Sequence, residues 1–158
     1  MSEINQPIPE PEDESKWLMQ LFGAIAGVVG LIIFIALFVP DWIASGYIEK
    51  RDEMLPIVQQ IKQAELEYFQ KHGKYLAVAP YPKEPTGLLY PWNREEAGAF
   101  NALGFQPQIE TRASYSVVLE GADFKVMGIS DVDGDRIEAT YVATKDKAAA
   151  LITNPKIY

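Results

Sequence analysis

Three aspartates form the one cluster in this 158-residue chain whose types and spacing suit a chemical role: Asp131, Asp133 and Asp135. Carboxylates at alternating positions of a short loop can converge on a hard cation such as calcium, which takes six to eight oxygen ligands. Against a full EF-hand loop, the sixth position is Arg136 instead of glycine and the twelfth is Val142 instead of glutamate. Two interpretations therefore remain, a tight hairpin turn without metal and a turn that binds calcium.

Most other chemistry is excluded by composition. The chain has no cysteine, which removes thiolate nucleophiles and thiolate metal ligands, and its single histidine, His72, is interpreted as a capping or surface group at a helix end. It contains no phosphate-binding loop and no Gly-x-Ser-x-Gly elbow. The formal charge of −8, without a basic stripe, argues against a nucleic-acid partner. We therefore expect no enzymatic activity and no cofactor other than calcium.

A long apolar run lies near the N-terminus. Residues 17–39 contain no charged side chain, and at about 1.5 Å per residue they reach roughly 35 Å, enough to cross a hydrocarbon core of about 30 Å. Trp17 and Trp42 stand at the two ends, where amphipathic rings favour the headgroup level. We therefore predict an uncleaved transmembrane helix over residues 17–42. Residues 1–16, rich in proline and acidic side chains, are predicted to be a disordered acidic tail.

One face of the predicted transmembrane helix is built from small residues. Gly23 and Gly27 have the spacing that lets a second helix approach closely, and Gly30 extends nearly the same face. Gln20 falls on the same side and could donate an interhelical hydrogen bond. This face predicts contacts with other membrane protein subunits, while lipid surrounds the rest of the helix.

The remaining residues, 43–158, are predicted to form one small domain. Its first element is an amphipathic helix over about residues 47–72, ended by Gly73. Pro40 predicts a kink or break at the membrane exit, and Pro56 predicts a bend. The helix has an apolar stripe for packing and charged residues that we expect to face water. The stripe consists of Leu55, Val58, Ile61 and Tyr68, and the solvated charges include Glu65 and Glu67.

A loop and a small sheet follow the helix. Residues 73–112 are rich in proline and are predicted to be a loop with a short helix over 95–103. Residues 113–144 contain runs of strand length at 113–119, 124–129 and 137–143, separated by turn residues. Residues 145–158 form a C-terminal tail. The predicted fold class is α+β: an N-terminal transmembrane helix that continues into an amphipathic helix packed on a small antiparallel β-sheet.

The order of these elements, together with particular residues, resembles the type IV pilin and pseudopilin family. Residues 64–75, with an aromatic pair and a Gly-x-Tyr exit, are similar to the end of the long pilin helix. Residues 103–117 resemble the family's approach to its first strand, and residues 124–144 its later hairpin. The resemblance implies a pilin-like domain that is a structural or accessory subunit of a bacterial envelope assembly, a type IV pilus or secretion-type machine. It also implies a single-pass protein of the bacterial cytoplasmic (inner) membrane with a periplasmic domain.

The sequence departs from that family at its N-terminus. The leader is acidic rather than basic, and no glutamate follows Gly23, Gly27 or Gly30 at the family's spacing. We therefore expect a pilin-type domain on a permanent anchor rather than a processed filament subunit. The distribution of basic residues weakly favours the opposite orientation, since Lys16 precedes the apolar run and both Lys50 and Arg51 follow it. An alternative function remains, that of an accessory transmembrane subunit of an unrelated membrane complex, for example an energy-converting one.

Overall fold

The computed structural model describes residues 14–85, 87–108 and 110–158. The chain divides into two compact units, Met1–Ile43 and Ala44–Tyr158. Most of the predicted acidic tail, residues 1–13, lies outside the described residues. Residues 14–16, also predicted as tail, form the start of helix α1 (Glu14–Asp52).

The N-terminal unit is the apolar part of α1. Large apolar side chains are exposed all along residues 17–38, and none of the most apolar window of the helix is buried. A helix that is apolar on every side needs an apolar surrounding, which lipid provides. Within the described residues, this is the one helix long and apolar enough to span a membrane, judged by its length and composition.

The sequence predicts a kink or a break at Pro40, and of these two the break is wrong. Helix α1 continues through Pro40 to Asp52, and the interruption lies at Glu53, before helix α2 (Met54–His72). A proline removes one hydrogen bond of the helical ladder, and the structure accommodates this loss without ending the helix. The interruption lies one turn before Pro56, which has no N–H to donate to the Asp52 carbonyl, so the helix is interrupted where a bend caused by Pro56 would begin.

Helix α2 buries one stripe against the domain. Val58 and Ile61 are buried as predicted, whereas Leu55 is 40% exposed and is not part of the stripe. The prediction that Glu65 faces water is wrong, because its side chain is completely buried on this face. The helix ends at Gly73 as predicted, in a left-handed conformation whose N–H donates to the Phe69 carbonyl at 2.8 Å.

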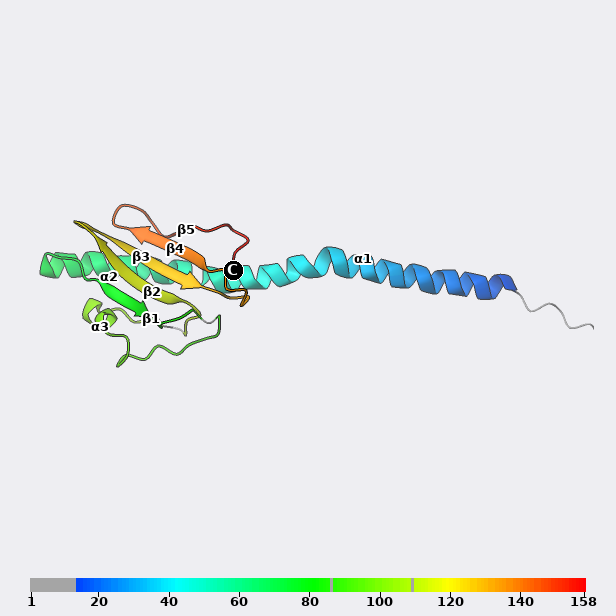
Figure 1. Ribbon diagram of the computed structural model, residues 1–158, viewed down its shortest axis with the longest axis horizontal. Coiled ribbons are helices and arrows are strands. Elements are labelled where there is room, and N and C mark those ends of the chain that lie inside the picture. Colours follow the sequence, from blue (N-terminus) through cyan, green and yellow to red (C-terminus); the bar gives the residue numbers. More distant parts are fainter. Residues whose placement is uncertain (1–13, 86, 109) are drawn as a thin grey trace, which may run out of the picture. The chain divides into compact units, whose positions relative to one another are not determined.

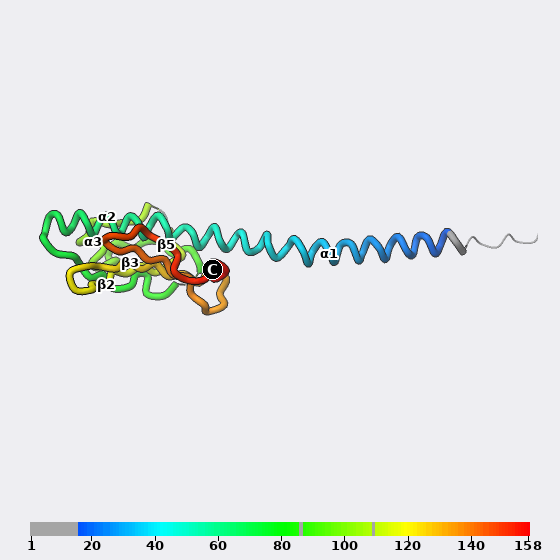
Figure 2. Tube along the Cα trace, turned by 90° about the horizontal axis from the view of Figure 1, so that it is seen from above, coloured from blue at the N-terminus to red at the C-terminus, as the bar shows by residue number. Residues whose placement is uncertain are grey.

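A five-stranded antiparallel sheet packs on α2, with the strand order β1-β2-β3-β4-β5 (Figures 1 and 2). The three predicted strands are confirmed as β2 (Ser114–Glu120), β3 (Asp123–Ser130) and β4 (Ala139–Thr144). The two edge strands lie in segments predicted as loop and tail: β1 (Val78–Tyr81) and β5 (Ala150–Leu151). The α+β class and the antiparallel sheet are therefore as predicted, with two additional short strands.

One face of the sheet forms the core with α2. Along β3 and β4 every second residue is buried, as the two-residue period of a strand requires. The short helix α3 (Ala99–Leu103) and the preceding loop close one side of this core through an aromatic cluster. In that cluster the Trp92 ring lies 4.9–5.8 Å from three others, those of Tyr81, Phe100 and Phe105.

Helix α2 packs closely on the sheet at Gly128 of β3. A Cβ atom built on Gly128 would lie 2.7 Å from Val58 Cγ2 and 3.2 Å from the Tyr115 ring. Both neighbours are themselves fully buried and have no free volume to move into. The absence of a side chain at Gly128 therefore sets the distance between helix and sheet.

We expect Gly128→Ala to lower the free energy of unfolding by about 1–3 kcal/mol, the usual cost of overpacking a core. Val58→Ala alone leaves a cavity and also destabilises. Val58→Ala also removes the methyl group that the new Cβ at position 128 would meet. The double variant should therefore be more stable than the sum of the two single effects predicts. Denaturant unfolding of the four proteins in detergent measures this coupling, and strictly additive effects would contradict the contact.

Candidate functional site

The three aspartates predicted as a metal site lie in the loop between β3 and β4. Asp131 organises this loop, since its Oδ1 accepts a hydrogen bond from the Gly134 N–H at 2.9 Å and its Oδ2 one from the Arg136 N–H at 3.1 Å. Asp135 Oδ1 accepts from the Ile137 N–H at 2.7 Å. Arg136 adopts φ of 70°, unusual for a residue with a Cβ, which shows how sharply the loop turns.

The loop brings the three carboxylates together, with one oxygen from each of Asp131, Asp133 and Asp135 within 4.8 Å of the others. Asp133 Oδ1 is buried and has no hydrogen-bond donor among the described residues. Desolvation raises the pKa of Asp133 above its ordinary value; the negative charges of Asp135 and Asp131 add to this effect, and a backbone hydrogen bond from Asp135 partly opposes it. Three carboxylates held this close repel one another unless a cation or a proton lies between them.

The two interpretations of this loop account for different residues. A metal-free hairpin turn accounts for Asp131 and Asp135, whose oxygens hold backbone N–H groups, but it leaves Asp133 Oδ1 without a donor among the described residues. Calcium would use the free lone pairs of all three, with water or backbone carbonyls completing the six to eight oxygens that it needs. The all-oxygen donor set therefore fits a hard divalent cation, and calcium remains a prediction.

The aspartate loop is packed against the loop that follows β1. At Gly87, a Cβ atom would lie 3.1 Å from Val132 Cα, so only glycine permits this approach, and φ of 65° favours glycine as well. The Arg112 Nη1 donates to the Gly87 carbonyl at 3.1 Å, and the Val132 N–H donates to the Tyr158 carbonyl at 3.1 Å. The position of the aspartates therefore depends on segments far away in the sequence.

Sequence reasoning missed a buried polar junction around Arg51, which was considered only as a charge beside the membrane. The Arg51 side chain is almost fully buried; its Nη1 donates to the carbonyls of Pro155 at 2.6 Å and Ile157 at 3.1 Å. Its Nε pairs with Asp52 at 2.8 Å, and Asp52 accepts a 2.6 Å hydrogen bond from the Tyr141 hydroxyl. Although burial opposes ionisation, the hydrogen bonds from Arg51 and Tyr141 hold the pKa of Asp52 below its ordinary value.

Glu65 is the second buried polar group that the sequence analysis misjudged. Its Oε2 accepts a hydrogen bond from the Leu76 N–H at 3.1 Å, while its Oε1 is buried without a donor among the described residues. Desolvation raises the pKa of Glu65 to about 7, and the Leu76 hydrogen bond only partly opposes it. The signal that could have revealed it is position: residue 65 follows Val58 and Ile61 on the same helical stripe.

The predicted helix-packing residues lie on α1 and are open. A Cβ atom built on Gly23, Gly27 or Gly30 meets no atom of the described structure within 4 Å, and Gln20 is exposed. The contact of this strip with a partner helix stays a prediction.

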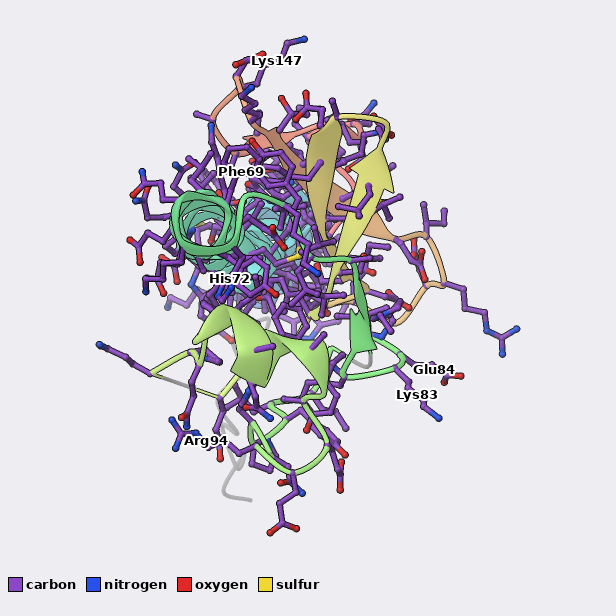
Figure 3. The ribbon with its side chains drawn as sticks, turned by 90° about the vertical axis from the view of Figure 1, so that its left-hand side faces the viewer. Phe69, His72, Lys83, Glu84, Arg94 and Lys147 are labelled. Carbon is purple, nitrogen blue, oxygen red and sulfur yellow. The ribbon has the colours of Figure 1, made fainter. Side chains whose placement is uncertain are left out.

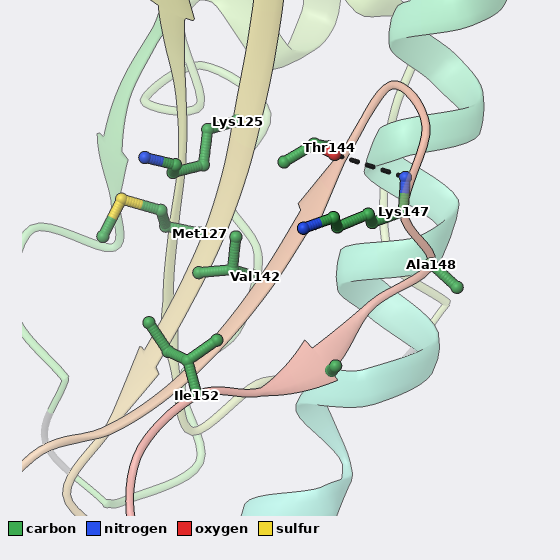
Figure 4. A pocket seen from close by; sticks show the side chains of 8 residues that line it. Lys125, Met127, Val142, Thr144, Lys147, Ala148 and Ile152 are labelled. Atoms are coloured by element: carbon green, nitrogen blue, oxygen red, sulfur yellow. Dashed lines mark hydrogen bonds between the residues drawn. The ribbon is translucent and has the colours of Figure 1, made fainter.

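The outer face of the sheet, opposite α2, carries an apolar hollow of about 460 Å³ over β3, β4 and β5 (Figure 4). Met127, Val142 and Ile152 form much of its lining, and Lys125 and Lys147 lie at its margin. Lys125 is paired with Glu120, and the Lys147 backbone N–H donates to Thr144 Oγ1. The lining thus combines apolar side chains with two cations and has no carboxylate or histidine to act as a base.

His72 lies on the last turn of α2, close to Phe69 at the end of the domain shown in Figure 3. It is exposed, and its ring lies against that of Tyr68, with centroids 4.2 Å apart and the planes tilted by 34°, which fits the surface role expected for it. Comparison of the chain with protein-family models, with curated proteins and with solved structures finds no match.

The raised pKa of Glu65 predicts that stability falls as the pH increases. Below about pH 4.5 the carboxyl is protonated in both the folded and the unfolded chain, so the buried group carries no penalty. Between about pH 4.5 and pH 7 the unfolded chain loses this proton while the folded chain keeps it, so stability falls by up to about 3 kcal/mol and falls no further above about pH 7. Glu65→Gln should abolish this pH dependence, whereas Glu67→Gln, at an exposed position, should retain it. Thermal midpoints of the three proteins, measured between about pH 4 and about pH 8, test this. Parallel pH profiles for wild type and Glu65→Gln would contradict it.

Calcium binding by the aspartate loop predicts a gain in stability. With a dissociation constant of about 0.1–1 mM, typical of extracellular modules, about 10 mM calcium should stabilise the fold by about 1–3 kcal/mol. Asp133→Asn should remove the gain, and Asp146→Asn, at an exposed position outside the loop, should leave it intact. A thermal midpoint that calcium does not move in the wild-type protein would eliminate the metal interpretation.

Proposed function

We propose that this chain is a non-enzymatic, single-pass membrane protein with a pilin-like domain, which acts as a structural or accessory subunit of a bacterial envelope assembly of the type IV pilus or secretion type. The observation that supports the proposal is that two consecutive helices have different surfaces. Helix α1 exposes apolar side chains all along residues 17–38, while α2 buries one stripe beneath an antiparallel sheet. An apolar anchor followed by a spine for a small sheet is the organisation that the resemblance to type IV pilins implies.

The anchor offers a surface for another helix. Lipid is as apolar as a leucine side chain, so helices associate in membranes through close packing and polar contacts rather than through the hydrophobic effect. Gly23, Gly27 and Gly30 supply a flat strip, and Gln20 supplies an amide on the same side. We propose that this strip contacts other membrane subunits of the assembly.

The domain would lie on the periplasmic side of the cytoplasmic membrane. The resemblance supports this orientation, and the excess of one basic residue after the apolar run is too small to oppose it strongly. The acidic side chains Glu49, Asp52 and Glu53 after that run favour neither orientation, because the positive-inside rule for membrane proteins counts lysine and arginine.

Purification from native membranes, followed by identification of the co-purifying proteins, tests the function directly. Components of a pilus or secretion machine would support the proposal. Subunits that carry redox cofactors or ion-translocating helices would overturn it in favour of an accessory role in an energy-converting complex. The intact mass of the purified chain shows independently whether the anchor is retained.

The strip of glycines predicts a specific effect of mutation. Gly27→Leu should sharply reduce the recovery of partner subunits, because a leucine side chain prevents close approach of the backbones. Val28→Leu adds bulk at the next position, about 100° around the helix, and should leave recovery unchanged. Quantitative co-purification at equal expression levels measures both. Equal losses for the two variants would show that the strip has no special role.

A further inference from the structure

We propose that one end of the domain docks in the interfacial layer of the bilayer, with Leu88, Leu89 and Ile137 inserted among zwitterionic lipid headgroups. The inference rests on the membrane anchoring proposed above and adds a second lipid contact that anchoring alone does not require. The contact is made by two neighbouring loops, residues 87–90 and 131–138.

These loops expose more apolar surface than their role as connections needs. Leu88 is 71% exposed, Ile137 53% and Leu89 48%. A single exposed leucine is ordinary on a protein surface, but several large apolar side chains in neighbouring loops mark a surface that contacts protein or lipid.

The two loops lie together at the end of the domain where residues 44–52 enter it. Gly87 approaches Val132 so closely that a Cβ atom would lie 3.1 Å from Val132 Cα. The Val132 N–H donates to the Tyr158 carbonyl at 3.1 Å, and the Tyr158 ring lies 5.8 Å from that of Tyr47. Leu88 and Ile137 are therefore on loops held to the first turns of the domain. Figure 1 shows the C-terminus at the same end.

Chain connectivity keeps this end near the lipid. The apolar run ends at Val39 and the domain begins at Ala44, and five residues span at most about 18 Å even when fully extended. The headgroup layer on each side of a bilayer is about 5–7 Å thick. The opposite end of the domain carries the hairpin between β2 and β3, where Leu119 is exposed to a similar degree but has no such tether.

Apolar transfer favours the docked state. Burial of one leucine side chain shifts such an equilibrium by roughly 10- to 150-fold, and the tether removes most of the entropic cost of bringing the loops to the surface. The aspartates beside the leucines would be repelled by anionic lipid. Zwitterionic headgroups, which present ammonium groups, are the better partner for Asp131, Asp133 and Asp135.

The absence of cysteine from the chain allows a clean test. The full-length protein is reconstituted in phosphatidylcholine vesicles with EDTA, and a polarity-sensitive fluorophore is attached to single cysteines introduced as Leu88→Cys, Ile137→Cys or Leu119→Cys. Nitroxide lipids labelled near the headgroup then report contact with the interface. Val28→Cys, in the apolar run, is probed with nitroxide placed deep in the acyl chains.

Docking predicts a blue-shifted emission and quenching by shallow nitroxide at positions 88 and 137, and neither effect at 119. Quenching at 88 no stronger than at 119 overturns the proposal, and a blue shift without lipid quenching overturns it as well, because a protein partner then covers the loops. Deep quenching at Val28→Cys reports the anchor separately. If that signal is absent, the membrane anchoring itself fails rather than the docking.

A second variant makes the contribution of the leucines explicit. Leu89→Asp should reduce the docked population reported from position 88 by at least about 10-fold, without changing the thermal midpoint, because the side chain is exposed. Replacing half of the lipid with phosphatidylglycerol should weaken docking through repulsion of the aspartates. Unchanged quenching in the Leu89→Asp variant would show that apolar insertion does not hold the loops at the surface.

Discussion

The contact between α2 and the inner face of the sheet is the interaction on which the domain depends. The domain has a single core, whose centre is the contact of Val58 and Ile61 with β3 and β4, and the aromatic cluster beside α3 extends it on one side. Gly128 sets the depth of that contact, because any side chain there would collide with Val58. Without the sheet, the apolar stripe of α2 would face water, and without α2 a sheet this small would have no cover.

The stripe on α2 is more regular than its residue types suggest. Buried or partly buried positions recur at alternating intervals of three and four residues, which keeps them on one face of the helix. Arg51 and Glu65 occupy this series as fully as the apolar residues do, and each has polar groups of the domain placed to meet it. Arg51 is well satisfied, whereas Glu65 retains a buried oxygen without a donor in the described part of the chain. The series begins with Arg51 at the end of α1 and continues on α2 with Met54, Val58, Ile61, Glu65 and Tyr68.

Sequence periodicity predicted the central elements because their stability is encoded within each segment. The apolar run, the stripe on α2 and the alternation in β2 to β4 each extend over enough residues to be recognised alone. Strands β1 and β5 could not be recognised, because each is a few residues long and exists through pairing with a neighbour. Glu65 was misjudged because its charge was given more weight than its position on the stripe. The convergence of the three aspartates followed from their spacing, but the Arg51 junction joins residues 104 and 106 positions apart, which no local pattern reveals.

The orientation of α2, roughly along the strands, has a mechanical consequence. In Figure 1 the strands of the domain run roughly along α2, so tension applied through residues 44–52 would act in shear on the whole helix–sheet contact at once. The bonds from Arg51 to the carbonyls of Pro155 and Ile157 would bear part of the same load. Shear distributes a pull over many contacts, whereas peeling would break them one at a time. The domain is thus arranged to withstand traction along its own helix.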